Sequence, residues 1–243
     1  MRKNNTVSPM MQKVIETIAG FGALTTQAVA LTVGINAGAA RAFIASGRRA
    51  GLLEKGQKGL YTITAEGQTA AGMPHSVWSY LCRVTNANVN HLYACAVAAA
   101  GVGRRYDCEL VGERAMRRME WARKRGIASA TMKGKRFHVR LPRLHRADFT
   151  AILGNGVLVA FEIECSRKSW RILLAIIRAW VKCNRVGYVV YAIPREARCV
   201  RVDVERAIRK LGPVAQEKIL LVWLEDLLED APLPELDRVF NGQ

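Results

Sequence analysis

The sequence predicts a mixed α/β protein in two parts, a small helical part with a β-hairpin and then a mixed sheet flanked by helices. The chain has 243 residues, more than one domain of average size, and half of them are hydrophobic, so each part can bury a core. Ala71-Gly72-Met73-Pro74 is a plausible boundary between the two parts. We therefore expect a first domain at residues 1–74 and a second at residues 75–243.

The first part is predicted to contain three short helices followed by a hairpin. Ser8-Pro9 is typical of a helix start, with serine as the cap and proline at the first helical position. Thr26 is a plausible cap for the second helix, and residues 59–64 alternate as a strand does. The expected helices are Met10–Ala19, 24–31 and Asn36–Ala50.

Basic side chains gather on the third helix and in the hairpin loop, namely Arg41, Arg48, Arg49, Lys55 and Lys58. Three helices followed by a basic hairpin is the order of the winged helix-turn-helix family, and this stretch resembles that family. The resemblance implies that the third helix enters the major groove of double-stranded DNA and that the hairpin touches its backbone. The alternative is a winged module that serves dimerisation or other protein contacts.

The charge of the chain also points to a polyanion. Lys and Arg number 37 against 20 Asp and Glu, a formal net charge of +17, which is typical of proteins that bind nucleic acid or acidic membrane surfaces. Residues 104–146 hold 14 basic and 4 acidic residues. We expect this band, including Arg117 and Arg118 on a helix predicted at Glu113–Arg125, to contact the DNA backbone. A merely solvated charged face is the alternative.

Several classes of protein are disfavoured. The longest apolar runs, Leu92–Gly103 and Ile172–Val181, fall short of the roughly 20 residues of a membrane span. The polar N-terminus lacks the apolar stretch of a signal peptide. The six cysteines form no C-x-x-C pair and are typical of reduced thiols. We therefore expect a cytoplasmic protein without disulfides or membrane insertion; its oligomeric state is left open.

In the second part the elements follow a mixed α/β order, with a strand meander that leads into a crossover helix. The expected helices are Asn88–Ala100, Glu113–Arg125, Ser169–Cys183 and Val204–Leu211. The expected strands are Tyr106–Val111, Phe137–Leu141, Ala147–Leu153, Val157–Cys165, Gly187–Ile193 and Ile219–Leu224.

The most informative segment is a predicted hairpin whose tight turn is residues 154–156 (Gly-Asn-Gly). If the turn is centred on its asparagine, Asp148 lies across from Glu162 with about 5 Å between their Cβ atoms, and Arg146 faces Glu164. Alternation places the apolar residues of both strands on the buried side. Asp148, Glu162 and Glu164 then share the other side.

Three carboxylates on one face repel one another unless a cation lies between them. Mg²⁺ or Mn²⁺ prefers such oxygen ligands, and in phosphoryl chemistry it neutralises the phosphate. We therefore expect Asp148, Glu162 and Glu164 to bind the metal, with Glu113 as a further candidate ligand. Lys168, on the first turn of the next helix, could place its ammonium beside the same phosphate. The alternative is ordinary salt bridges with neighbouring basic residues on an exposed sheet face.

The order Asp148…Glu162-Ile163-Glu164, in a strand–turn–strand–helix setting, resembles the PD-(D/E)xK restriction-endonuclease-like nucleases. The resemblance implies metal-dependent cleavage of DNA with Asp148, Glu162, Glu164 and Lys168 as catalytic residues. The sequence departs from the family's pattern at two positions, since Ala147 stands where proline is common and Glu164 occupies the usual lysine position. Lys168 is then the lysine, moved to the following helix.

A winged helix joined to a degenerate PD-(D/E)xK domain, in a basic chain of this length, resembles the MobC (MOBC-type) relaxases of mobilisable plasmids and the related replication-relaxation proteins. The resemblance covers essentially the whole chain. It implies binding at a plasmid origin of transfer, metal-dependent nicking of one strand, and work in a relaxosome beside accessory proteins and a coupling protein.

Two alternatives are kept, a non-catalytic DNA-binding regulator with a decayed nuclease fold and a double-strand endonuclease. Relaxases that use a tyrosine nucleophile hold a metal on a His-hydrophobe-His pattern, and the four histidines are not spaced that way. His145 could touch the site, but we interpret it as a surface histidine. Tyr188 and Tyr191 lie in an apolar strand and are interpreted as core.

Overall fold

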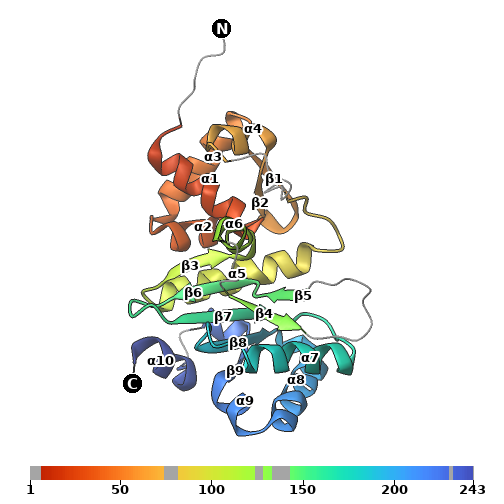
Figure 1. Cartoon of the computed structure of the whole chain (residues 1–243). Helices are drawn as coiled ribbons and strands as arrows, with labels where there is room; N and C mark the ends of the chain where they lie inside the picture. The colour runs from red at the N-terminus through yellow and green to blue at the C-terminus, as the bar shows by residue number, and fades with distance from the viewer. Residues whose placement is uncertain (1–6, 74–81, 124–127, 133–142, 230–231, 243) are drawn as a thin grey trace. The chain divides into compact units, whose positions relative to one another are not determined.

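The computed structural model describes residues 7–73, 82–123, 128–132, 143–229 and 232–242 (Figure 1). The chain forms two compact units, the first made of Met1–Arg105 and Val111–Arg118 and the second of Tyr106–Leu110 and Met119–Gln243. Both contain helices and strands, so the fold is mixed α/β, as the sequence predicts. The domain boundary predicted after residue 74 falls in 74–81, outside the described residues.

The helices of the first unit begin where the sequence places caps. The Ser8 hydroxyl accepts a hydrogen bond from the Met11 N–H at 3.2 Å, and the Asn36 side chain accepts one from Ala39 at 2.8 Å. Thr25, and not the predicted Thr26, caps the second helix. The elements of this unit are α1 (Pro9–Phe21), α2 (Thr26–Val33), α3 (Ala37–Arg49), β1 (Leu53–Lys55), η1 (Gln57–Gly59), β2 (Tyr61–Ile63), α4 (Ala65–Ala70), α5 (Val89–Arg105) and the start of α6 (Glu113–Arg123).

The core of the first unit lies between its helices and the β1–β2 hairpin. Ile15, Ile18 and Leu24 are fully buried there, and α5 packs against α2. Gly67 allows α4 to approach the hairpin closely, because a Cβ at this position would lie 2.1 Å from the carbonyl oxygen of Leu52. The predicted three helices and hairpin are therefore present, with α4 and α5 added to them.

The second unit is built on a mixed sheet with the order β3-β6-β7-β8-β9, and the last two residues of β3, Val111 and Gly112, belong to the first unit (Figure 1). Strands β6 and β7 are antiparallel, while β7, β8 and β9 run parallel. Strands β4 and β5 form a separate antiparallel pair. The strand predicted at Phe137–Leu141 lies outside the described residues. The elements are β3 (Glu109–Gly112), β4 (Ser129–Met132), β5 (Arg143–Arg146), β6 (Phe149–Ile152), β7 (Leu158–Ile163), α7 (Trp170–Val181), β8 (Tyr188–Ile193), η2 (Arg195–Ala197), α8 (Arg198–Leu211), α9 (Pro213–Lys218), β9 (Ile219–Trp223), η3 (Glu225–Leu227) and α10 (Pro234–Asn241).

The β6–β7 hairpin has the predicted register. Phe149 pairs with Phe161, and the turn closes with a hydrogen bond of 3.0 Å from the Leu153 N–H to the Val157 carbonyl. Gly156 adopts a φ of 80°, in the left-handed region that glycine tolerates best. The prediction of this hairpin and its turn is confirmed.

The extension of the hairpin beyond Asp148 is different from the prediction. Arg146 ends β5 and pairs with Ser129 of β4, so it does not continue the hairpin to face Glu164. Glu164 instead donates its N–H to the carbonyl of Ala192, which follows Tyr191 on β8. The chain therefore leaves the β4–β5 sheet at Ala147 and joins the main sheet from Asp148, whose N–H bonds to the Phe161 carbonyl.

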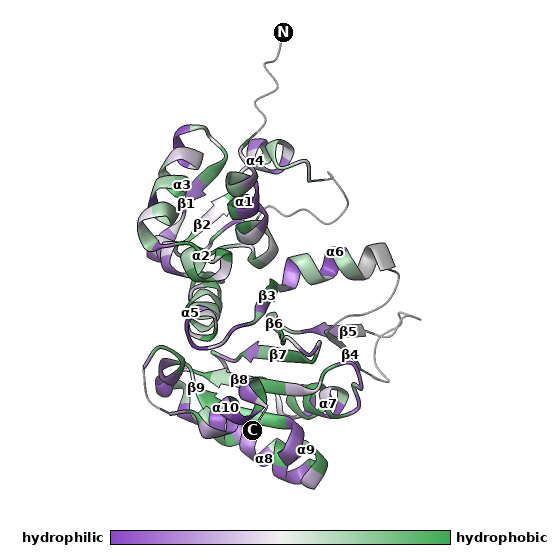
Figure 2. Ribbon diagram, turned by 90° about the vertical axis from the view of Figure 1, so that its left-hand side faces the viewer, coloured by the Kyte–Doolittle hydropathy of each residue, from purple (hydrophilic) through white to green (hydrophobic). Residues whose placement is uncertain are grey.

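Both faces of β7 are covered, so the exposed sheet face of the salt-bridge alternative is not what the structure has. Phe161 and Glu162 are neighbours on the strand and so point to opposite faces. Phe161 lies 6.4 Å from Phe240 of α10, between ring centroids, and Glu162 accepts a hydrogen bond from Trp180 of α7. Helix α8 buries only Val200, Val204, Ala207 and Ile208, and its many charged residues give it a largely hydrophilic colouring in Figure 2.

Among the described residues, a helix that could cross a membrane on its own is not found. Only α2 and α3 taken together reach the necessary length and apolarity, and they meet at an angle of 114°.

Candidate functional site

Glu162 is the centre of a polar cluster inside the second unit. Its side chain is held by two donors from different elements. Trp180 Nε1 on α7 donates to Oε1 at 3.0 Å, and Nε2 of His145 on β5 lies 3.0 Å from Oε1 and 3.1 Å from Oε2. Glu162 is 5% exposed and Trp180 is fully buried. A carboxylate in such a position is retained only with good hydrogen bonds, and this one has two side-chain donors, of which His145 is shared between both oxygens.

Asp148 enters the cluster from the start of the hairpin. Its Oδ2 accepts a hydrogen bond of 2.7 Å from the backbone N–H of Ile163, while its own N–H donates to the Phe161 carbonyl at 2.9 Å. These two bonds join Asp148 to Phe161 and Ile163, the residues that precede and follow Glu162 on β7. The juxtaposition of Asp148 and Glu162 that the sequence predicts is therefore present.

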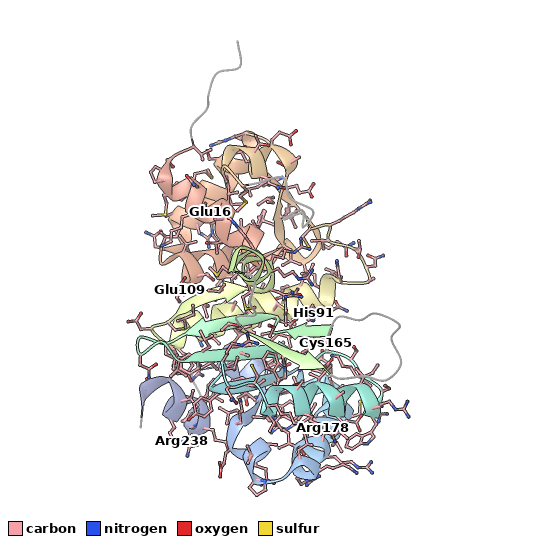
Figure 3. All side chains as sticks on the ribbon, in the orientation of Figure 1. Glu16, His91, Glu109, Cys165, Arg178 and Arg238 are labelled. Atoms are coloured by element: carbon pink, nitrogen blue, oxygen red, sulfur yellow. The ribbon has the colours of Figure 1, made fainter. Side chains whose placement is uncertain are left out.

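Glu164 completes the set of three carboxylates. It is 4% exposed, although it lies beyond the end of β7. Lys168 Nζ donates to its Oε2, so the lysine is joined to the cluster as an ion pair. Lys168 precedes the helix α7, whose N-cap is Ser169, so it is not on the first helical turn as predicted. Figure 3 labels Cys165, which follows Glu164, and Arg178 on the exposed side of α7.

Tyr191 is a further polar group of this region. It is paired in register with Glu162 on the neighbouring parallel strand β8, which puts the two side chains on the same face of the sheet. Tyr191 is fully buried, as predicted, but its hydroxyl has no hydrogen-bond partner among the described residues. The interpretation of Tyr191 as plain core is therefore incomplete.

The electrostatics of the cluster follow from its burial. Burial raises the pKa of Glu162 above its usual 4.5, against the opposing effect of His145. Burial alone would lower the pKa of His145, but the charge of Glu162 and the hydrogen bond to it outweigh burial, so this pKa is raised above 6.5. The pKa of Tyr191 is raised well above 10 by burial and by the three carboxylates. The His145–Glu162 pair thus holds a proton tightly, and Tyr191 stays a neutral donor.

The cluster carries the donor type of a hard divalent cation, but in the described conformation the oxygens of its three carboxylates are not gathered as closely as one shared ion requires. Asp148, Glu162 and Glu164 supply carboxylate oxygens from one hairpin, the donor type that Mg²⁺ and Mn²⁺ prefer. The unpaired Tyr191 hydroxyl marks a place where the described side chains leave a buried polar atom unsatisfied. In the described conformation His145 and Lys168 supply the positive groups that offset the carboxylates.

The arginines predicted to bind DNA share the exposed side of α3. Arg41, Arg48 and Arg49 are all exposed, whereas Ala40, Ile44 and Gly47 of the same helix are buried. Helix α3 contains no acidic residue, and none of the three arginines forms an ion pair with another described residue. Their charge is therefore available to an external anion.

The other residues predicted to bind DNA have more varied surroundings. Lys55 ends β1 and is exposed, whereas the ammonium of Lys58 lies 5.2 Å from the centroid of the Tyr93 ring on α5. Arg117 donates to Glu113 at 3.0 Å from Nε and 2.5 Å from Nη2. Arg118, the last of the residues predicted to bind DNA, lies beside Arg117 on α6 and is exposed.

Glu113 belongs to the first unit, where Arg117 is its partner. Its suggested role as a metal ligand remains a prediction.

Sequence reasoning missed two residues that hold the cluster together. His145, interpreted as a surface histidine, has a side chain that is only 20% exposed and binds Glu162. Trp180, on the helix predicted at Ser169–Cys183 and given no role by the sequence, donates to the same carboxylate. A tryptophan in a strongly apolar helix next to a strand with two glutamates was a usable signal, because a buried indole N–H needs an acceptor.

Comparisons with known proteins do not identify the chain. No protein-family model, curated protein or solved structure matches it.

Proposed function

We propose that the chain is a plasmid-mobilisation relaxase of the MobC kind, which binds double-stranded DNA at an origin of transfer and nicks one strand in a reaction that depends on Mg²⁺ or Mn²⁺. The observation that carries this proposal is the cluster of Asp148, Glu162 and Glu164 on one β-hairpin, with Lys168 paired to it and a helix following. In this proposal the first unit is a winged helix-turn-helix domain and the second a PD-(D/E)xK-like nuclease.

The arrangement of elements around the cluster supports the nuclease interpretation. An antiparallel hairpin leads into helix α7, and the chain then returns as the parallel strand β8 beside β7. This places the carboxylates of one hairpin at the centre of a mixed sheet, with helices on the same face. The strand–turn–strand–helix order is the setting in which the sequence motif resembles that nuclease family.

Each residue of the cluster has a role in the proposed reaction. Asp148, Glu162 and Glu164 would hold the cation, and Lys168 would stabilise the charge of the scissile phosphate. His145 orients the Glu162 carboxylate and can exchange a proton with it at Nε2. When bound, the cation supplies charge neutralisation at the phosphate and lowers the pKa of the attacking hydroxyl.

DNA binding is assigned in this proposal to the exposed side of α3 and to the basic residues of the hairpin and of α6. The exposed surface of α3 combines three arginines with small residues such as Ala42 and Ala45, so a backbone or groove can approach it closely. Arginines that neutralise phosphates release counterions, which makes such binding sensitive to salt. Relaxosome accessory proteins and a coupling protein are the proposed partners.

A non-catalytic DNA-binding regulator is the second candidate, and one observation favours it. Every carboxylate of the cluster already has a donor from the protein, Ile163 for Asp148, Trp180 and His145 for Glu162, and Lys168 for Glu164. In a decayed nuclease, such internal partners could replace the cation permanently. The two candidates differ in whether a divalent cation changes what happens to bound DNA.

Relaxation of a supercoiled plasmid that carries the chain's native origin region tests the proposal. The wild-type chain is compared with Glu162→Gln and Asp148→Asn, with and without Mg²⁺ or Mn²⁺. Glu217→Gln is the matched control, because Glu217 is exposed and lies on α9. We expect cation-dependent open circles from the wild type and from Glu217→Gln, and a loss of at least a hundredfold in the two cluster variants.

The other outcomes distinguish the alternatives. Linear product would indicate a double-strand endonuclease instead of a nickase. Tight binding without cleavage, unchanged by the cation, would reject the catalytic proposal and leave the regulator. If open circles form equally in Glu162→Gln, the nicking site is not this cluster.

Binding to DNA is tested separately from cleavage. Replacing Arg41, Arg48 and Arg49 by alanine should weaken the affinity for DNA. The loss should be the same for DNA fragments that share the origin region and differ only in the flanking sequence. The replacement should also reduce the slope of log affinity against log salt concentration by about 0.9 for each phosphate that an arginine no longer neutralises. An unchanged slope would show that α3 does not contact DNA.

A further inference from the structure

The hydroxyl of Tyr191 is a buried polar atom that the fold does not use. The side chain is 0% exposed, its hydroxyl has no partner among the described residues, and it lies on β8 opposite Glu162. A buried donor without an acceptor destabilises the folded state. Phenylalanine would fill the same space without this cost, so packing alone does not account for the hydroxyl.

The surroundings of Tyr191 say what kind of partner the hydroxyl can take. Its pKa lies well above the usual value because of burial and of the charges of Glu162, Glu164 and Asp148, so it is a neutral O–H that donates. Among the carboxylates that act on it, Glu162 is its register partner on the adjacent strand and shares its face of the sheet. Because the Tyr191 side chain is closed to solvent, these carboxylates are better placed than DNA to supply an acceptor.

The acceptors of the cluster are engaged in the described conformation. Glu162 is held by His145 and Trp180, and Glu164 by Lys168. A divalent cation at these carboxylates would compete with the positively charged donors, because like charges repel at short range in a buried site. A carboxylate that loses His145 or Lys168 in this way needs another donor to keep its orientation.

We infer that Tyr191 is a positioning residue for the divalent cation, and that its hydroxyl donates to a carboxylate of the cluster when the cation is bound. This inference rests on the proposed function, since it requires the cluster to bind a cation. Tyr191 lies on β8, outside the hairpin that carries the three carboxylates, and in this inference its hydroxyl has a partner only when the cation is bound.

Binding of Mn²⁺ to the full chain without DNA tests the inference, with free Mn²⁺ measured by electron paramagnetic resonance. Tyr191→Phe removes only the hydroxyl. We expect it to weaken Mn²⁺ binding about tenfold, the fold-change that one hydrogen bond to a charged group corresponds to. Without metal, the melting temperature of Tyr191→Phe should equal or exceed that of the wild type, since an unpaired donor has been removed.

Tyr188→Phe is the matched control, because Tyr188 lies on the same strand but faces the opposite side of the sheet, paired with Val159. It should leave Mn²⁺ affinity unchanged. Asp148→Asn should abolish Mn²⁺ binding and so locate the site.

Three results would overturn the inference. If Tyr191→Phe binds Mn²⁺ as the wild type does while Asp148→Asn does not bind it, the cluster is a cation site but Tyr191 plays no part in it. If Tyr191→Phe lowers the melting temperature of the metal-free chain, the hydroxyl already has a partner without the cation. If the wild type itself does not bind Mn²⁺, the metal-dependent function fails, and this inference fails with it.

Discussion

Removal of the His145 imidazole tests whether Glu162 is a buried carboxylate that depends on its partners. His145→Ala leaves Glu162 with the Trp180 N–H as its one remaining side-chain donor among the described residues. Breaking a buried ion pair by removing one partner costs about 3–5 kcal/mol. Because the His145 side chain is 20% exposed and the Trp180 bond is kept, we expect the free energy of unfolding to fall by about 2–3 kcal/mol at pH 7.

A double-mutant cycle separates this pair from general damage to the fold. Urea unfolding is measured for the wild type, His145→Ala, Glu162→Gln and the double variant. Glutamine keeps an oxygen that can accept from Trp180 but carries no charge, so it removes the need for the imidazole. The loss in the double variant should therefore be smaller than the sum of the two single losses, by a coupling energy of about 1–2 kcal/mol.

The reasoning would be refuted by an effect no larger than that of an ordinary surface substitution, about 0.5 kcal/mol or less for His145→Ala. Strict additivity in the cycle would refute it too, because it would mean that His145 and Glu162 do not interact. In either case the carboxylate would be stabilised by something other than the imidazole.

Two further predictions concern stability. The pKa values of His145 and Glu162 are both raised, so the stabilisation that each gives is complete below its unfolded pKa, 6.5 or 4.5, and is lost as the pH rises through the folded pKa. The free energy of unfolding should therefore decline as the pH rises above 4.5 and then above 6.5, and more steeply in the wild type than in Glu162→Gln; equal slopes would contradict this. Gly67→Ala should lower the free energy of unfolding by about 1–3 kcal/mol, because the new Cβ would meet the Leu52 carbonyl. Gly154→Ala should change the free energy of unfolding little, because Gly154 has open space around it.

The parts of the fold that could be predicted are those fixed by local chemistry. Ser8-Pro9 determines the start of α1, and the turn at residues 154–156 determines the register that brings Asp148 close to Glu162. Both depend on a few adjacent residues and on backbone geometry. For the same reason the hairpin and the proximity of these two carboxylates follow from the sequence without any knowledge of tertiary packing.

The parts that could not be predicted depend on contacts distant in sequence. The alternating hairpin indicated one buried face and did not say what lies against the other, but α7 covers that face, which is why Glu162 and Glu164 are buried. His145 approaches Glu162 from the separate β4–β5 sheet, whose partner strand begins at Ser129. Alternation within one strand indicates which residues share a face and does not indicate what packs against it.

The energetics of the cluster bear on the choice between an enzyme and a binding protein. Buried ion pairs are weak evidence for stability, since apolar residues of similar volume often serve a fold as well or better. Here two buried glutamates, a buried indole N–H and an unpaired tyrosine hydroxyl are concentrated on adjacent elements at the centre of one sheet. A sheet that only supports a DNA-binding module has no need of Glu162 or of the Tyr191 hydroxyl. Local departures from the rules of core packing are expected where a site has a function to perform. If the proposed cation-dependent reaction is correct, these costly residues belong to its site, and the proposal then leads us to expect metal-dependent nicking by the wild type that is lost in Glu162→Gln.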